Sequence, residues 1–147
     1  MLTWKQMELL NRVAALHHRS LPTYLAYARP WVALGGEANA HVIEDIAADH
    51  HDVVERVLEV LETADRPVSL GDFPMEYTSL NDLSLDFVLG EVTRFERRLL
   101  HSLEDIATWL DRESTATRLV NLAIGMAKGH LQNLAELTKS SSSRSAS

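Results

Sequence analysis

The sequence ADRPVSLGDFPMEYTS, residues 64–79, separates two long amphipathic segments of this chain. At about 16 residues it is longer than the roughly 2–8 residues that usually join packed helices. It contains Pro67, Gly71 and Pro74, together with apolar residues that we expect to pack along the neighbouring helices. A connection of this kind crosses the length of a helical bundle. The helices on either side of it are therefore predicted to run in the same direction.

Two amphipathic segments lie on each side of this connection. Apolar residues recur in each at every third or fourth position, which is typical of helices that bury one face. We expect helices at residues 3–29 and 37–63, from Ser79 or Asn81 to Leu110, and at residues 115–139. Pro22 lies inside the first helix and is expected to kink it. The prediction is an all-α fold: a four-helix bundle over residues 1–139, made of two helical hairpins joined by a long crossover between helices 2 and 3.

Composition excludes several classes of protein. The 147 residues suit a single domain, and the serine-rich residues 140–147 predict a disordered tail. A net charge of −7 argues against a nucleic-acid partner, and no apolar run approaches a membrane span. We therefore expect a cytoplasmic protein with neither a nucleic-acid nor a membrane partner. The absence of cysteine excludes disulfides, zinc–thiolate sites and thiolate-held iron–sulfur clusters.

Histidine recurs near the middle of three of the predicted helices. His17, His50 and His130 each lie on the apolar stripe of a helix, and Glu91 lies on the stripe of the remaining helix. A single buried polar residue is common in a bundle, but one on every helix points to a shared site. Imidazole-rich sites suit iron, zinc, copper or nickel. The sequence therefore predicts a metal site formed by His17, His50, Glu91 and His130.

The sequence does not decide which of two glutamates, Glu91 or Glu96, supplies the carboxylate of this site. Counted from the predicted turns, His130 lies level with Glu96. Glu91 lies about one turn deeper, an offset of several ångström at about 1.5 Å per residue. Glu96, however, falls off the predicted apolar stripe of this helix, which comprises Leu83, Phe87, Val88, Glu91, Phe95, Leu99, Leu103, Ile106 and Leu110. The alternative to a metal site is a set of separate polar groups, each hydrogen-bonded in a partly hydrated core.

A second histidine pattern lies on the second predicted helix. His51 and Glu55 are one turn apart, as in hemerythrin-type iron sites, and the following helix offers His101 with Asp105. The hemerythrin pattern needs a further His-x-x-x-His pair, which is missing. A hemerythrin-like oxygen or redox sensor is therefore the weaker alternative. An exposed pair of residues on one helix face is the simpler interpretation.

Three stretches carry a family resemblance. They are NRVAALHHRSLPTYLAYAR at residues 11–29, ERVLEVLE at residues 55–62 and KGHLQNLAEL at residues 128–137. Together they resemble the bacterioferritin branch of the ferritin-like superfamily, over roughly residues 2–138. The resemblance implies a ferritin-like four-helix bundle that associates through its first two helices into at least a homodimer. Trp4, Trp31 and Val32, near the ends of the first helix, would suit such an interface.

The resemblance also implies a di-iron site, from which this sequence departs. Such sites use a carboxylate on the first and third helices and Glu-x-x-His on the second and fourth. His17 stands at the first carboxylate position, and Ile46 and Asp49 stand at the Glu and His of the second helix. On the fourth helix His130 matches the histidine, but Ala127 replaces the glutamate. Both bridging glutamates are therefore missing, and a ferroxidase centre of the usual kind is not expected.

These observations lead to two functional predictions. The first is a diverged ferritin-like protein with an altered, histidine-rich metal site, which would bind or oxidise iron or hold another transition metal. The alternative is a non-catalytic ferritin-like bundle that has lost its di-iron centre and serves as an assembly or interaction module. The resemblance implies that haem would be held by a methionine of the second helix, and because no methionine lies between Gly36 and Met75, haem is not expected.

Overall fold

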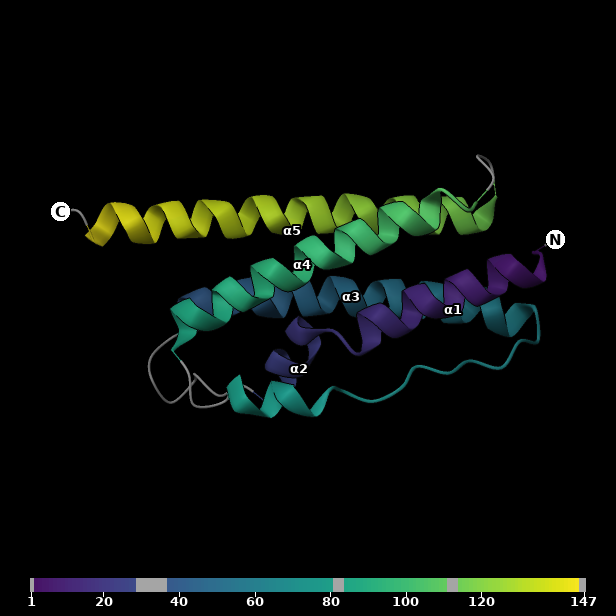
Figure 1. Cartoon of the computed structure of the whole chain (residues 1–147), viewed down its shortest axis with the longest axis horizontal. Coiled ribbons are helices and arrows are strands. Elements are labelled where there is room, and N and C mark those ends of the chain that lie inside the picture. Colours follow the sequence, from purple (N-terminus) through teal and green to yellow (C-terminus); the bar gives the residue numbers. More distant parts are fainter. Residues whose placement is uncertain (1, 29–36, 81–83, 111–113, 146–147) are drawn as a thin grey trace.

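The computed structural model describes residues 2–28, 37–80, 84–110 and 114–145, with side chains described except at 37–39, 85 and 138–145 (Figure 1). Within these ranges every regular element is helical, which confirms the all-α prediction. The elements are α1 (Trp4–His18), α2 (Leu21–Ala28), α3 (Glu37–Thr63), the 3₁₀ helix η2 (Met75–Leu80), α4 (Leu85–Ala107) and α5 (Thr115–Ser145). Trp31 and Val32, the expected interface residues, lie outside the described ranges.

The four longest helices pack against one another, and the connection between α3 and η2 runs back along them (Figure 1). As a result α3 and α4 run in one direction, while α1 and α5 run in the other. Asn11 of α1 fixes the path of the connection. Its amide nitrogen donates to the carbonyl oxygen of Ser69, and its side-chain oxygen accepts from the Ser69 N–H, both at 2.9 Å. The ring of Tyr24 in α2 also packs edge-on against Phe73, with centroids 5.4 Å apart.

The single helix predicted at residues 3–29 is divided into two. α1 ends at His18 and α2 begins at Leu21, so the break falls before Pro22. Proline is tolerated in the first turn of a helix, where its missing N–H would have no partner within the helix. Ser20 caps this new start, because its Oγ accepts a hydrogen bond from the N–H of Thr23 at 3.2 Å. The expected kink is therefore a complete break with its own cap.

The interior consists of two apolar clusters with a polar layer between them. The first cluster comprises Leu10, Val13, Ala14, Val53, Val57, Leu61, Leu99, Leu103, Ile106, Ala116, Val120, Ala123 and Ala127. The second comprises Leu21, Tyr24, Leu25, Ala40, Ile43, Ile46, Val88, Leu89, Val92 and Leu134. The buried side chains His17, Ser20, His50, Glu96 and His130 fall between the two clusters along the sequence. Each of α1, α3, α4 and α5 thus contributes one side chain to the polar layer, while Thr117, also buried, lies apart from it near the start of α5.

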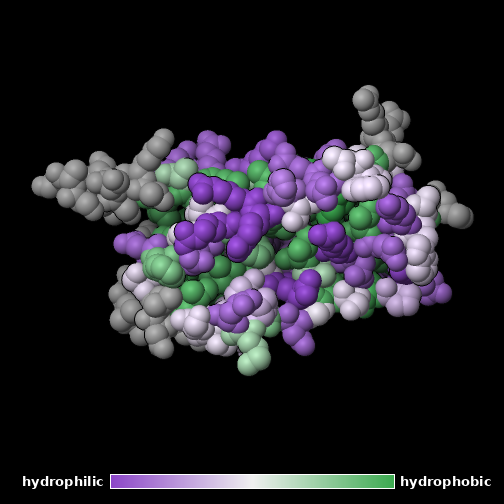
Figure 2. All heavy atoms as spheres, in the orientation of Figure 1, coloured by the Kyte–Doolittle hydropathy of each residue, from purple (hydrophilic) through white to green (hydrophobic). Residues whose placement is uncertain are grey.

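The surface shows charged and polar side chains with apolar ones between them (Figure 2). Among the exposed large apolar side chains are Trp4, Tyr27, Met75, Phe87 and Trp109. None of the described helices has an apolar stretch long enough to cross a bilayer. The backbone of α5 is helical to Ser145, where composition predicts a disordered tail from residue 140. No glycine or proline follows Gly129 to end that helix.

Replacing Asn11 with alanine is expected to destabilise the protein. The substitution removes both hydrogen bonds to Ser69 and should lower the free energy of unfolding by about 1–2 kcal/mol, since each such bond contributes on the order of 1 kcal/mol. Urea denaturation monitored by circular dichroism measures this. The matched control is Asn121→Ala, an exposed asparagine of α5, which should shift stability by less than about 0.5 kcal/mol. Equal effects of the two substitutions would contradict the role assigned to Asn11.

Candidate metal centre

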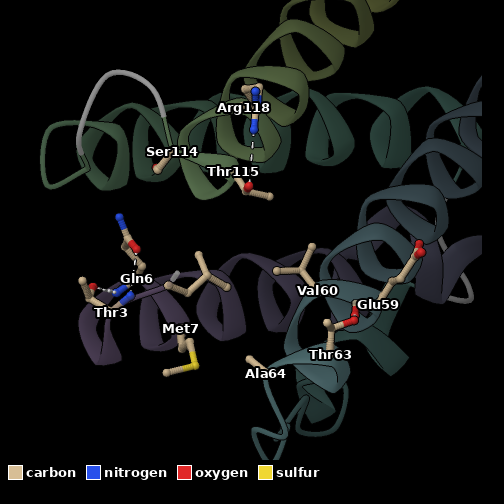
Figure 3. A pocket seen from close by; sticks show the side chains of 11 residues that line it. Thr3, Gln6, Met7, Glu59, Val60, Thr63, Ala64, Ser114, Thr115 and Arg118 are labelled. Carbon is tan, nitrogen blue, oxygen red and sulfur yellow. Dashed lines mark hydrogen bonds between the residues drawn. The ribbon is translucent and has the colours of Figure 1, made fainter.

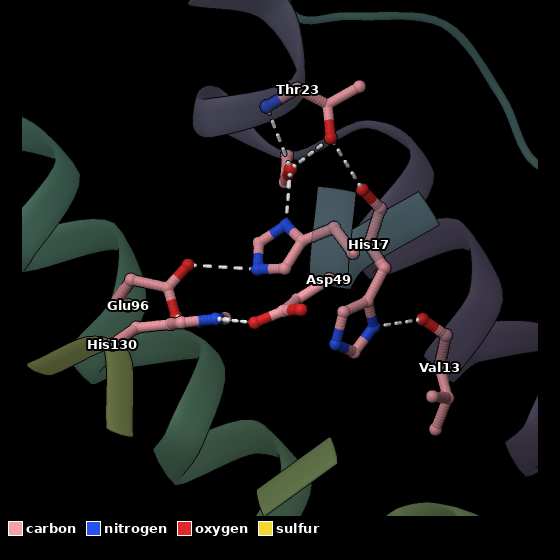
Figure 4. A network of polar contacts seen from close by, with 8 residues as sticks. Val13, His17, Thr23, Asp49, Glu96 and His130 are labelled. Atoms are coloured by element: carbon pink, nitrogen blue, oxygen red, sulfur yellow. Dashed lines mark hydrogen bonds and ion pairs between the residues drawn. The ribbon is translucent and has the colours of Figure 1, made fainter. Parts of the chain in front are cut away.

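Three buried side chains from three helices converge in the polar layer. Nε2 of His50 (α3) lies 2.9 Å from Oε1 of Glu96 (α4), and Nδ1 of His130 (α5) lies 3.3 Å from Oε2 of the same carboxylate (Figure 4). One potential ligand atom from each residue lies within 4.8 Å of the others, so the group could hold a metal ion. The side chains of His50, Glu96 and His130 are 2%, 0% and 6% exposed, so the site is screened from bulk water.

Each of the two imidazoles is held on its far side by a further residue. Nδ1 of His50 lies 2.7 Å from Oγ of Ser20, and Nε2 of His130 lies 2.6 Å from Oδ2 of Asp49. Histidine ligands in metal sites commonly use one ring nitrogen for the ion and bond the other to a carboxylate, hydroxyl or carbonyl. Here the ring nitrogens that face Glu96 are the two left available to an ion.

The contact between His50 and Glu96 is close but is not a well-formed hydrogen bond. Nε2 and Oε1 lie at hydrogen-bond distance, yet neither atom has a hydrogen-bond partner of suitable geometry among the described residues. Both atoms are fully buried, and leaving such groups unpaired costs about 1–3 kcal/mol each. A cation held between the imidazole nitrogen and the carboxylate oxygen would satisfy both.

The charges of the site favour cation binding. Burial raises the pKa of Glu96, but the contacts and charges of His130 and His50 outweigh it and lower that pKa to about 2. Burial lowers the pKa of His130, but Glu96 and Asp49 outweigh it and raise that pKa. Glu96 is therefore ionised at neutral pH, and the positive charge that balances it can be a proton on His130 or a metal ion.

His17 lies beside this group but is not part of it. Its ring packs edge-on against the ring of His50, with centroids 4.9 Å apart, and its Nδ1 donates to the carbonyl oxygen of Val13 at 2.7 Å (Figure 4). Burial, followed by the nearby charge of His50, lowers the pKa of His17 to about 3. The ring is thus a neutral neighbour of the site.

The structure brings together two of the four sequence-predicted ligands. His50 and His130 converge, whereas Glu91 is partly exposed and forms an ion pair with Arg94. Glu96 takes the place expected for Glu91, because α4 buries the stripe that contains Val88, Val92 and Leu99. That spacing of four, four and three residues from 88 through 92 and 96 to 99 was available in the sequence. The same helix also carries Phe87, Glu91 and Phe95 at a helical spacing, so the sequence alone does not decide which of the two faces is buried.

The hemerythrin-type residues lie elsewhere. His51 and Glu55 are 76% and 62% exposed, with Nε2 and Oε1 3.7 Å apart, and His101 is exposed on α4. A pocket of about 1020 Å³ (Figure 3) has no residue of the polar layer in its lining. It lies between the starts of α1 and α5 and the end of α3, and its lining includes Gln6, Val60 and Arg118. Neither feature adds to the metal group.

Ser20, His50 and Glu96 also form a line of contacts like that of a hydrolase triad. Ser20, however, has no solvent exposure, so its hydroxyl cannot reach a substrate without opening the bundle.

Comparison with known proteins adds no further assignment: no family model matches the chain, and no curated protein matches it. The donor set is therefore what indicates the chemistry of the site.

The buried neutral His17 is expected to make the metal-free protein sensitive to acid. In the unfolded chain the histidine binds a proton below a pKa of about 6.5, whereas folded His17 does so only near pH 3. Stability should therefore fall as the pH falls below 6.5, by up to about 1.4 kcal/mol per pH unit from this residue. Between pH 6.5 and 5, Glu96 stays ionised in both the folded and the unfolded chain and does not contribute. Over this range the free energy of unfolding, measured by urea denaturation, should change less per pH unit in the His17→Asn variant than in the wild type.

The substitution His18→Asn, at an exposed neighbouring position, is the matched control for loss of a histidine. A slope for His17→Asn equal to that of the wild type would contradict the assignment of a neutral, buried His17.

Proposed function

We propose that this protein binds a single transition-metal ion in the core of a ferritin-like four-helix bundle, through His50, Glu96 and His130. The observation that carries the proposal is the pair of buried, unpaired atoms, His50 Nε2 and Glu96 Oε1, that face each other at 2.9 Å. Ser20 and Asp49 support it, because each holds an imidazole by the nitrogen that an ion would not use.

The proposed bundle would hold one ion rather than two. Ile46 and Ala127 occupy positions where the family resemblance implies glutamates, and each is only 1% exposed within the apolar clusters. Two apolar side chains cannot supply the bridging oxygens that a pair of irons requires. The ferritin-like fold itself is supported by the long connection and by the shared direction of α3 and α4.

The donor set indicates the class of metal. Two imidazoles and one carboxylate suit Fe²⁺, Zn²⁺, Co²⁺, Ni²⁺ or Cu²⁺, whereas Ca²⁺ and Mg²⁺ prefer oxygen ligands. A bound ion of this class would supply Lewis-acid or, with iron or copper, redox chemistry. The chain's residues would donate the ring nitrogens, neutralise the charge through Glu96, orient His130 through Asp49 and exclude bulk water. Uptake would displace the proton that His130 otherwise holds between two carboxylates.

The alternative proposal is a bundle without a resident metal, acting as an assembly or interaction module. It is favoured by the contacts of His130 with both Glu96 and Asp49, because a protonated ring there would balance much of the buried charge. In that case the polar layer would serve only to specify how the helices pack.

Metal analysis separates the two proposals. Protein purified without chelators, or reconstituted with Co²⁺ as a spectroscopic probe, is expected to hold about one ion per chain. His50→Ala, His130→Ala and Glu96→Gln should each weaken Co²⁺ binding by at least about 100-fold, since each removes one of three protein ligands. Asp49→Asn should weaken binding by about 10–100-fold through the orientation of His130. Titrations followed by visible absorption, with total metal by mass spectrometry, measure both quantities.

His101→Ala removes an exposed histidine of α4 and serves as the matched control. If the core variants change the free energy of unfolding but leave metal content equal to that of the control, the metal site is refuted and the interaction module is favoured.

A further inference from the structure

The break between α1 and α2 brings two hydroxyl groups to the far side of His50. Ser20 is fully buried, and its Oγ lies 2.7 Å from His50 Nδ1 and 2.8 Å from Thr23 Oγ1. Thr23 Oγ1 in turn donates to the carbonyl oxygen of His17 at 3.2 Å (Figure 4). These contacts form an unbroken chain from a backbone carbonyl, through two hydroxyls, to the imidazole of a proposed ligand.

The carbonyl oxygen of His17, at the end of this series of hydrogen bonds, determines which atom donates in each of them. A backbone carbonyl can only accept, so the single hydroxyl proton of Thr23 points towards His17. Thr23 Oγ1 must then accept from the hydroxyl of Ser20. Because Ser20 has no second proton, its Oγ accepts from Nδ1–H of His50. The neutral ring therefore carries its proton on Nδ1 and leaves a lone pair on Nε2, towards Glu96.

The opposite set of donor and acceptor roles in these hydrogen bonds would satisfy fewer of the observed contacts. In it Thr23 would donate to Ser20, Ser20 to His50 Nδ1, and Nε2–H of His50 to Glu96. The carbonyl of His17, whose backbone donor Ser20 N lies at 3.4 Å, would lose its hydroxyl partner. The Nε2–H would also have to point at Glu96 Oε1, 2.9 Å away, where no well-aligned hydrogen bond is formed, whereas the first arrangement turns two acceptor atoms towards each other, as a cation between them requires. The geometry favours the first arrangement.

We propose that Ser20 and Thr23 are positioning residues that hold His50 in its Nδ1–H tautomer, so that Nε2 is presented to the metal ion. The inference rests on the proposed metal site and extends it to two residues that do not touch the ion. It also gives the break in the first helix a chemical role. The hydroxyl of Ser20 that caps α2 is the same group that accepts from His50.

The substitution Thr23→Val tests the inference while preserving side-chain shape. Without the Thr23 hydroxyl, Ser20 has no side-chain acceptor there and can turn its proton onto His50 Nδ1, which leaves the ring proton on Nε2. Nitrogen NMR of histidine-labelled, metal-free protein, at a pH where the ring is neutral, should show Nδ1–H in the wild type and Nε2–H in Thr23→Val. Co²⁺ binding should weaken by about tenfold, the lower end of effects from outer residues of metal sites.

Two further variants separate positioning from general loss of packing. Thr23→Ser keeps the hydroxyl and should restore both the tautomer and the affinity. Thr93→Val removes a partly buried threonine hydroxyl of α4 that donates to the Leu89 carbonyl at 2.9 Å, outside the Ser20 network. It should change neither. If Thr23→Val does not fold, Ser20→Ala provides the same comparison, because it removes the acceptor itself.

The outcomes distinguish this inference from the proposed function. An Nε2–H ring in the wild type, or the same tautomer in the wild type and Thr23→Val, overturns the inference even if cobalt binds. The expected tautomer change in a protein that binds no cobalt supports the hydroxyl relay but refutes the metal site it is proposed to serve. A change in both tautomer and affinity, restored by Thr23→Ser, supports both.

Discussion

A carboxylate with no exposure to solvent is the constraint on which the rest of the structure depends. Burying an ionised carboxylate without partners costs on the order of several kcal/mol, and Glu96 lies on the inner face of α4 with zero exposure. His50 from α3 and His130 from α5 approach its two oxygens, and Ser20 and Asp49 hold the far sides of those rings. The packing of three helices is therefore tied to the pairing of one charge.

The sequence was sufficient for those parts of the fold that depend on local pattern. Periodic apolar residues located the helices, and the long segment with Pro67 and Pro74 indicated the crossover seen between α3 and α4. The sequence predicts His50 and His130 for the same reason, since each is a polar residue on an otherwise largely apolar stripe. The break after His18 differs from the predicted kink, because Ser20 accepts a hydrogen bond from the Thr23 N–H and so caps a new helix beside Pro22.

The parts that could not be predicted depend on contacts between helices. The sequence pattern favours Glu91 over Glu96 as the buried carboxylate, because α4 carries apolar residues on two adjacent faces and only packing decides which face is buried. The contact of Ser20 with His50 joins residues 30 positions apart in the chain, and that of Asp49 with His130 joins residues 81 apart. No periodicity within one helix contains that information. The side-chain directions that make a donor set out of scattered residues emerge only when the helices are assembled.

The polar layer has a consequence for the alignment of the bundle. His17, His50, Glu96 and His130 each have apolar cluster residues three or four positions away on both sides. Sliding one helix by a single turn, about 5.4 Å, would place a charged or imidazole group against alkyl side chains. The polar side chains that it contacts in the observed packing would lose that partner. Apolar stripes alone would tolerate such a slip, because leucine and valine pack against many neighbours. The polar layer therefore specifies a single register, that is, one relative position of the helices along their axes.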